Sequence, residues 1–167
     1  ERRLTHWQPE GAWLFVTWRL FGSLPAEVRM LTGDSFARWD LELGRAATGP
    51  RWLADERVAD LVVETIRYGA EVLDLYELRA WVVMVNHVHV LIRPLVPLAR
   101  ITKAVKSFSG RRANQLLGRN GPFWMGESYD HWVRGPEELE RIVRYIERNP
   151  VVVGLASRPE DWRWSSA

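Results

Sequence analysis

The residues best suited to chemistry are His87 and His89, which lie two positions apart within a run of apolar, β-branched residues. Side chains at positions i and i+2 of a strand project from the same face of the sheet. Two neighbouring imidazoles could bind one divalent cation or one phosphate, although alone they make only part of a metal site. The alternative is a strand whose two histidines face water or hydrogen-bond to neighbours.

Tyr145 and Asn149 form a second pair, four residues apart and therefore one turn apart on the same side of a predicted helix. If this helix packs over the histidine strand, a cation held by the imidazoles and the Asn149 oxygen could polarise a phosphoryl oxygen. Tyr145 could then attack phosphorus and form a covalent phosphotyrosine. Alternatively, Tyr145 is a half-buried tyrosine with its hydroxyl in water, and Asn149 is a helix C-cap before Pro150.

The charges of the chain are segregated along the sequence. Residues 78–126 hold eight of the 23 Lys and Arg residues and none of the 21 Asp and Glu residues. Five of these cations lie on a predicted helix over residues 97–117, as expected of a surface that binds a phosphate backbone. The alternative is a solvated helix face. The predicted DNA-binding residues are Arg100, Lys103, Lys106, Arg111 and Arg112.

The composition excludes several classes of chemistry. The 167 residues contain no cysteine, so disulfides, thiolate metal ligands and cysteine nucleophiles are excluded. No apolar run reaches the roughly 18–20 residues of a membrane-spanning helix, and the first residues lack the apolar core of a signal peptide. We therefore expect one domain over residues 1–167, no membrane partner, and a cytoplasmic location.

The remaining patterns predict the elements that position these residues. Alternation and β-branched content predict strands over residues 11–20, 72–85, 87–93 and 128–133, with the second and third paired as a hairpin. Helical spacing predicts helices over residues 54–68, 97–117 and 136–149, the first stopped by Gly69 and the last by Pro150.

Two segments complete the predicted fold. Residues 26–50 show no clear pattern apart from a short helical turn over residues 26–31, and the tail from residue 151 onward is expected to pack back on the body. The order β, α, β, β, α, β, α predicts an α+β fold in which an antiparallel sheet packs against helices on one or both faces.

Two segments carry a resemblance to a known family. Met84-Val85-Asn86-His87-Val88-His89-Val90-Leu91-Ile92 resembles the HUH signature (His, hydrophobic residue, His) of single-tyrosine, IS200-like transposases. Tyr145-Ile146-Glu147-Arg148-Asn149-Pro150-Val151 resembles the nucleophile helix of the subgroup associated with repetitive extragenic palindromes (REP). The His-X-His motif alone is weak, but the two motifs in this order are specific. Further similarity covers most of residues 80–167 and, more weakly, residues 15–19.

The resemblance implies a ferredoxin-like α+β core and a divalent cation, Mg²⁺ or Mn²⁺. His87 and His89 would be metal ligands, with Asn149 a third. Tyr145 would attack single-stranded DNA beside a hairpin, leaving a 5′-phosphotyrosine and a free 3′-OH. The partner would be single-stranded or hairpin DNA, and the protein a monomer or homodimer. Two positions depart from the family pattern: Val85, where Pro is common, and the residues after Pro150, where a basic residue is frequent.

Two other functions fit the same residues. A non-catalytic nucleic-acid-binding module, such as a domesticated relative, would bind DNA with steep salt dependence but would not cleave it. A metal-dependent phosphodiesterase would hydrolyse DNA without a covalent intermediate, and would need an acidic ligand from Glu127, Asp130 or Glu147. Tyr129, which could lie near His131, is the alternative nucleophile.

Overall fold

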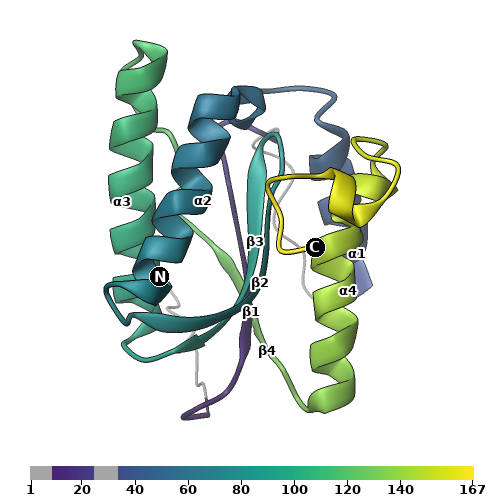
Figure 1. Ribbon diagram of the computed structural model, residues 1–167. Coiled ribbons are helices and arrows are strands. Elements are labelled where there is room, and N and C mark those ends of the chain that lie inside the picture. The colour runs from purple at the N-terminus through teal and green to yellow at the C-terminus, as the bar shows by residue number, and fades with distance from the viewer. Residues whose placement is uncertain (1–8, 25–33) are drawn as a thin grey trace.

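The computed structural model describes residues 9–24 and 34–167, so the helical turn predicted over residues 26–31 lies outside the described residues. Its strands are β1 (Leu14–Arg19), β2 (Tyr76–Val83), β3 (His87–Pro94) and β4 (Tyr129–Trp132). They form an antiparallel sheet in the order β2-β3-β1-β4 (Figure 1). With helical connections between β1 and β2 and between β3 and β4, this is the ferredoxin-like arrangement that the sequence predicted.

The described helices cover both faces of the sheet, with α2 and α3 on one face and α1 and α4 on the other (Figure 1). Their bounds are α1 (Asp34–Arg45), α2 (Glu56–Glu71), α3 (Leu98–Leu117) and α4 (Pro136–Val152), with short 3₁₀ helices η1 (Trp52–Ala54) and η2 (Pro159–Asp161). Within residues 9–24 and 34–167, none of the helices is both long and apolar enough to cross a membrane.

The alternation of side chains along β3 separates two apolar cores. Val88 and Val90 lie in the core that α2 and α3 cover, whereas Leu91 lies in the core that α1 and α4 cover. Residues two apart in a strand share a face. His87 and His89 therefore point in the direction of Leu91, toward α1 and α4.

Two predicted helix ends are wrong because packing overrides the local signal. α2 continues through Gly69 to Glu71, and the glycine makes room for a neighbour, because a Cβ there would lie 2.6 Å from the hydroxyl oxygen of Tyr76. α4 likewise continues through Pro150, which is buried in its last turn, and ends at Val152. A proline so near the end removes only the hydrogen bond of its own amide.

The segment without a clear sequence pattern contains α1. Phe36, Trp39 and Leu43 recur at helical spacing and are buried against the α1/α4 face of the sheet. This stripe fixes the rotation of α1 about its own axis. It thereby places Asp40, which lies between Trp39 and Leu43 on the same side, toward β3.

The tail packs back on the body, as the sequence predicted. The indole N–H of Trp162 donates to the carbonyl oxygen of Val83 over 3.0 Å. The backbone N–H of Ser166 donates to the carbonyl oxygen of Trp81 over 3.0 Å. The tail therefore covers the free edge of β2, whose other edge pairs with β3.

Candidate metal centre and nucleophile

The two histidines of β3 are fully buried, each with a relative exposure of 0%. Their ring centroids lie 4.8 Å apart, so the predicted side-by-side projection is present. Two histidines that face water would not be buried in this way. The part of the alternative in which the histidines face water is therefore wrong, and the pair needs polar partners inside the protein, as the other part of it predicted.

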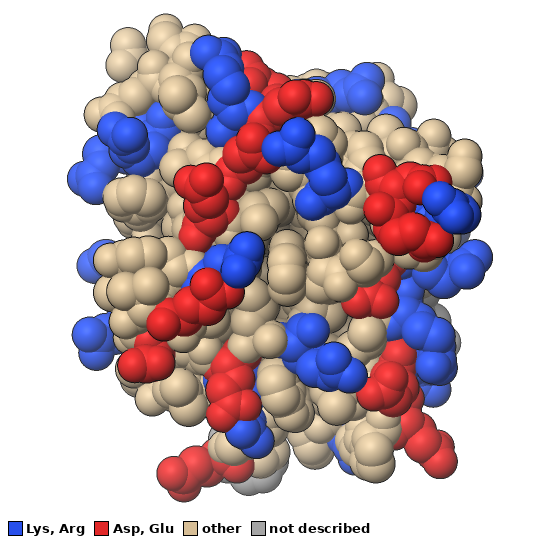
Figure 2. Space-filling view, viewed as in Figure 1, with Lys and Arg blue, Asp and Glu red and all other residues tan. Residues whose placement is uncertain are grey.

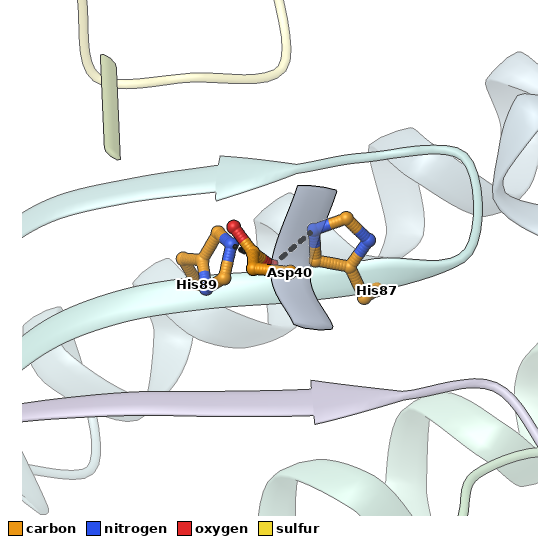
Figure 3. A group of neighbouring side chains, drawn as sticks. All are labelled: Asp40, His87 and His89. Atoms are coloured by element: carbon orange, nitrogen blue, oxygen red, sulfur yellow. Dashed lines mark ion pairs between the residues drawn. The ribbon is translucent and has the colours of Figure 1, made fainter. Parts of the chain in front are cut away.

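The main partner is Asp40 of α1, a residue that the sequence analysis did not identify. Its Oδ1 atom lies 3.0 Å from Nε2 of His89 and 3.4 Å from Nε2 of His87 (Figure 3). The carboxylate is only 2% exposed. The available signal was a carboxylate in the middle of the apolar stripe of Phe36, Trp39 and Leu43, where a helix normally places a core residue.

Hydrogen bonds behind the imidazoles fix which nitrogen of each ring faces Asp40. Asn86 donates its amide N–H to the carbonyl oxygen of Leu43 over 2.9 Å, which leaves Asn86 Oδ1 to accept from Nδ1 of His87 over 2.8 Å. The Nε2 atom of a neutral His87 is then an acceptor. Nδ1 of His89 lies 2.6 Å from the hydroxyl of Thr17, so its Nε2 also faces inward.

Four buried atoms of this centre lack a hydrogen-bond partner within residues 9–24 and 34–167. They are Asp40 Oδ1, His87 Nε2, His89 Nε2 and Asn149 Oδ1. A buried acceptor without a donor costs about 1–3 kcal/mol, and facing acceptors also repel. One ligand atom from each of the aspartate and the two histidines lies within 4.8 Å of the others. Two imidazole nitrogens and a carboxylate oxygen suit a divalent cation, and Asn149 as a further ligand stays a prediction.

The pKa shifts of His87 and Asp40 keep these two side chains in the form that binds a cation. Burial lowers the pKa of His87 to about 3, although Asp40 opposes the shift, so the ring is neutral at neutral pH. For Asp40, burial would raise the pKa. The neighbouring imidazoles and the hydroxyl of Tyr145 outweigh burial and hold the pKa below its usual range, so the carboxylate stays charged.

Tyr145 and Asn149 reach the same carboxylate from α4. The Tyr145 hydroxyl and the Asn149 amide both donate to Oδ2 of Asp40, the amide over 3.0 Å. Burial and the nearby Asp40 raise the pKa of Tyr145 well above its usual range, so the phenol keeps its proton at neutral pH. Asn149 is buried inside the helix and is not its C-cap. The predicted second pair and the histidine pair thus meet through Asp40.

The predicted DNA-binding cations lie on α3, across the sheet from this centre. Figure 2 shows basic side chains along the edge formed by α3, whereas acidic and basic side chains alternate over α2. Arg100, Lys103, Arg111 and Arg112 are exposed. Lys106 instead donates to the carbonyl oxygens of Gly126 and Glu127 and to the hydroxyl of Ser128. DNA binding by α3 stays a prediction.

Other residues considered from the sequence lie outside the centre. The ring of Tyr129 stacks on Phe36 with centroids 4.2 Å apart, and its hydroxyl makes no hydrogen bond to the centre among the described residues. Glu147 accepts from the hydroxyl of Ser166 in the tail. The acidic partner of the histidines is therefore Asp40 and not Glu127, Asp130 or Glu147.

Comparisons with known proteins gave one matching family and two similar solved structures. The family model described as Transposase IS200 like matches residues 51–149. A solved REP-associated tyrosine transposase bound to a REP hairpin is similar, with a TM-score of 0.60 and 18% sequence identity. The match covers 99% of this chain and 82% of the transposase chain. A transposase candidate from Deinococcus radiodurans R1 has a TM-score of 0.43 and 18% identity, covering 82% of this chain and 89% of its own. No curated protein matches the chain.

The fold and the centre define an α+β protein with a buried cluster of two histidines and a carboxylate that could hold a cation, and with a tyrosine beside it. The family match spans more than half of the residues, so the chain belongs to the IS200-like transposase family. This confirms the family resemblance of the two motifs. The structural match to the REP-associated transposase shows that the fold is shared as well. The matched range contains the histidine pair, Tyr145 and Asn149, but not α1, which supplies Asp40.

Proposed function

We propose that this protein is a DNA strand transferase that cleaves and rejoins single-stranded DNA through a 5′-phosphotyrosine on Tyr145, with Mg²⁺ or Mn²⁺ as its cation. The observation that carries the proposal is the shared carboxylate of Asp40. One of its oxygens faces the two imidazoles, and the other accepts the hydrogen bond of the Tyr145 hydroxyl. The nucleophile and the cation site are therefore joined by a single side chain.

Every bond and proton in the proposed reaction is accounted for by groups of the protein and the DNA. The Tyr145 oxygen forms a bond to phosphorus, and the bond from phosphorus to the 3′ oxygen breaks. The Tyr145 proton moves by way of Asp40 Oδ2 to the departing 3′ oxygen, which leaves as a hydroxyl. A cation held by the histidines would polarise the phosphoryl oxygen. Attack by a second 3′-OH reverses these steps and restores the phosphodiester without an external energy source.

We propose single-stranded DNA next to a hairpin as the substrate. Two observations support this choice. The similar solved structure is a transposase bound to a REP hairpin, and α3 presents exposed cations without an acidic residue between them in sequence. A phosphate backbone is the natural partner of such a helix.

The two competing functions fit the centre less well. A non-catalytic DNA-binding module gains nothing from four unpartnered buried ligand atoms, which cost stability. A hydrolytic phosphodiesterase could use Asp40 as its acidic ligand, but the Tyr145 hydroxyl already occupies the other oxygen of that carboxylate. Whether a covalent adduct forms separates all three functions.

The test is a denaturing gel after incubation with a pool of labelled hairpin oligonucleotides that carry randomised single-stranded flanks. We expect a denaturant-stable protein–DNA adduct with Mn²⁺ and none with a chelator. Tyr145→Phe should abolish the adduct but retain DNA binding, and Tyr129→Phe, the matched control, should retain the adduct. Cleavage by the native protein without any adduct would instead establish the hydrolase, and adducts in Tyr145→Phe would exclude Tyr145 as the nucleophile.

A further inference from the structure

A pocket of about 470 Å³ opens between α1 and α4 and leads to the candidate centre. Asp40, Tyr145 and Asn149 line it, whereas neither histidine does. A strand of DNA that presents phosphorus to the Tyr145 hydroxyl would therefore approach through this opening. Its rim is formed mainly by residues of α4, so the charges on that helix meet the strand first.

Three arginines line the same pocket: Arg141, Arg144 and Arg148. Their spacing of three and four residues places them along one side of α4, flanking Tyr145. The row extends for about 10 Å along the helix, and all three side chains are exposed. It is a cationic row on the rim of the nucleophile pocket, and the sequence analysis did not identify it.

The charge of this row is largely uncompensated. Arg144 and Arg148 make no ion pair with any residue of the ranges 9–24 and 34–167, and Arg141 only approaches Glu138 at 3.8 Å. Several other surface arginines are paired with a carboxylate, for example Arg67 with Glu71 at 2.9 Å and Arg163 with Asp60 at 2.7 Å.

The carboxylate inside the pocket does not neutralise the row either. Asp40 is buried and holds the imidazoles, Tyr145 and Asn149. Exposed guanidinium groups without a carboxylate partner are suited to the bidentate binding of phosphate oxygens.

We infer that Arg144 and Arg148, together with Arg141, bind the phosphates that flank the scissile phosphate in the single strand. The inference rests on the proposed function, since it assigns the strand-binding surface of the same site. It also separates two DNA contacts. The row on α4 holds the strand that reacts, and the cations of α3, on the opposite face of the sheet, are too remote from Tyr145 to position its target.

The test measures binding without chemistry. The Tyr145→Phe protein in chelator is titrated into fluorescein-labelled oligodeoxythymidine, which cannot form a hairpin, and Kd is followed by anisotropy over a series of salt concentrations. Adding Arg144→Ala and Arg148→Ala should weaken binding about tenfold at low salt. The slope of log K against log salt should fall by about 1.4, or 0.7 for each lost phosphate contact.

The matched control removes the same charge elsewhere, with Arg67→Ala and Arg163→Ala, and should leave the affinity within about twofold. Equal losses in the two double variants, or no loss in the α4 variant, would overturn the inference. Because no adduct is involved, this binding measurement can fail or succeed separately from the adduct test of the proposed function. If the native protein formed no adduct but the α4 double variant still lost affinity, the strand-transferase proposal would be refuted. The arginine row on α4 would still be supported as a strand-binding surface.

Discussion

The two faces of the sheet are built from the same strands, but only one of them gathers buried ligand-type atoms without hydrogen-bond partners among the described residues. On the face covered by α2 and α3, the buried atoms without partners among the described residues are indole N–H donors, of Trp18 and Trp81. On the face covered by α1 and α4, one such indole N–H, of Trp39, is accompanied by Oδ1 of Asp40, Nε2 of both histidines and Oδ1 of Asn149. Donors repel a cation, whereas converging acceptors bind one.

The two faces of the sheet therefore have different roles, one in stability and one in ligand binding. The α2/α3 face contains the larger set of buried apolar residues and stabilises the fold. The α1/α4 face keeps a charged carboxylate and two imidazole rings out of water, which costs stability unless a ligand compensates. Sites that break local folding rules in this way are typically functional. The comparison therefore predicts that variants of the centre affect cation binding far more than the fold.

Asp40→Asn should give the largest effect. The amide is nearly isosteric but removes the negative charge that faces both histidines. We expect Mn²⁺ binding, measured by isothermal titration calorimetry, to weaken by about 100-fold or more. The metal-free variant should melt near the native temperature, since an amide can still accept from Tyr145. Asp161→Asn, at an exposed ion pair, is the control. Unchanged Mn²⁺ affinity in Asp40→Asn would show that both faces are purely structural.

The pH dependence of stability gives the next largest effect. His87 has a pKa of about 3 when folded, against about 6.5 when unfolded. Between these values the unfolded state binds more protons, so stability falls as the pH is lowered. From pH 6.5 to 4.5 the metal-free protein should lose about 2 kcal/mol of unfolding free energy through this residue. Urea unfolding in chelator measures it. His87→Gln should flatten the curve, and an unchanged slope would contradict a neutral His87.

The sequence was sufficient for most elements because their signals are local. The alternation of Val88 and Val90 with the histidines predicted one face of β3, and the spacing of Tyr145 and Asn149 predicted one side of α4. The hairpin of β2 and β3 and the antiparallel α+β sheet followed from the order of the elements, and the family resemblance implied the ferredoxin-like arrangement. In each case a short repeat in the chain determines the orientation of the side chain.

The parts that the sequence did not predict depend on distant contacts. Asp40 lies 47 residues before His87, and only the packing of α1 against β3 brings them together. Gly69 resembles a helix end because its other role, contact with Tyr76, is not visible in a local pattern. The arginines of α4 have ordinary spacing for a solvated helix face. They become a candidate binding row only because the pocket opens beside them.

The smallest predicted effect concerns the cations of α3, of which one is bonded within the protein and the others are exposed to solvent. Burial lowers the pKa of Lys106 to about 8, and its ammonium group donates to the loop before β4. Lys106→Met should therefore cost about 1 kcal/mol of unfolding free energy and leave DNA affinity nearly unchanged. Lys103→Met, on the exposed side, should do the reverse and lower the salt slope of hairpin binding by about 0.9.

Chemical denaturation and salt-dependent anisotropy on the same two variants measure both quantities. If Lys106→Met lowered the salt slope as much as Lys103→Met while stability stayed at the native value, Lys106 would be a DNA contact. The α2/α3 face would then bind DNA through a residue that also lines the apolar core. A loss of stability without a loss of slope would restrict the DNA surface of α3 to its exposed cations, since a lysine that already donates three hydrogen bonds has no donor left for phosphate.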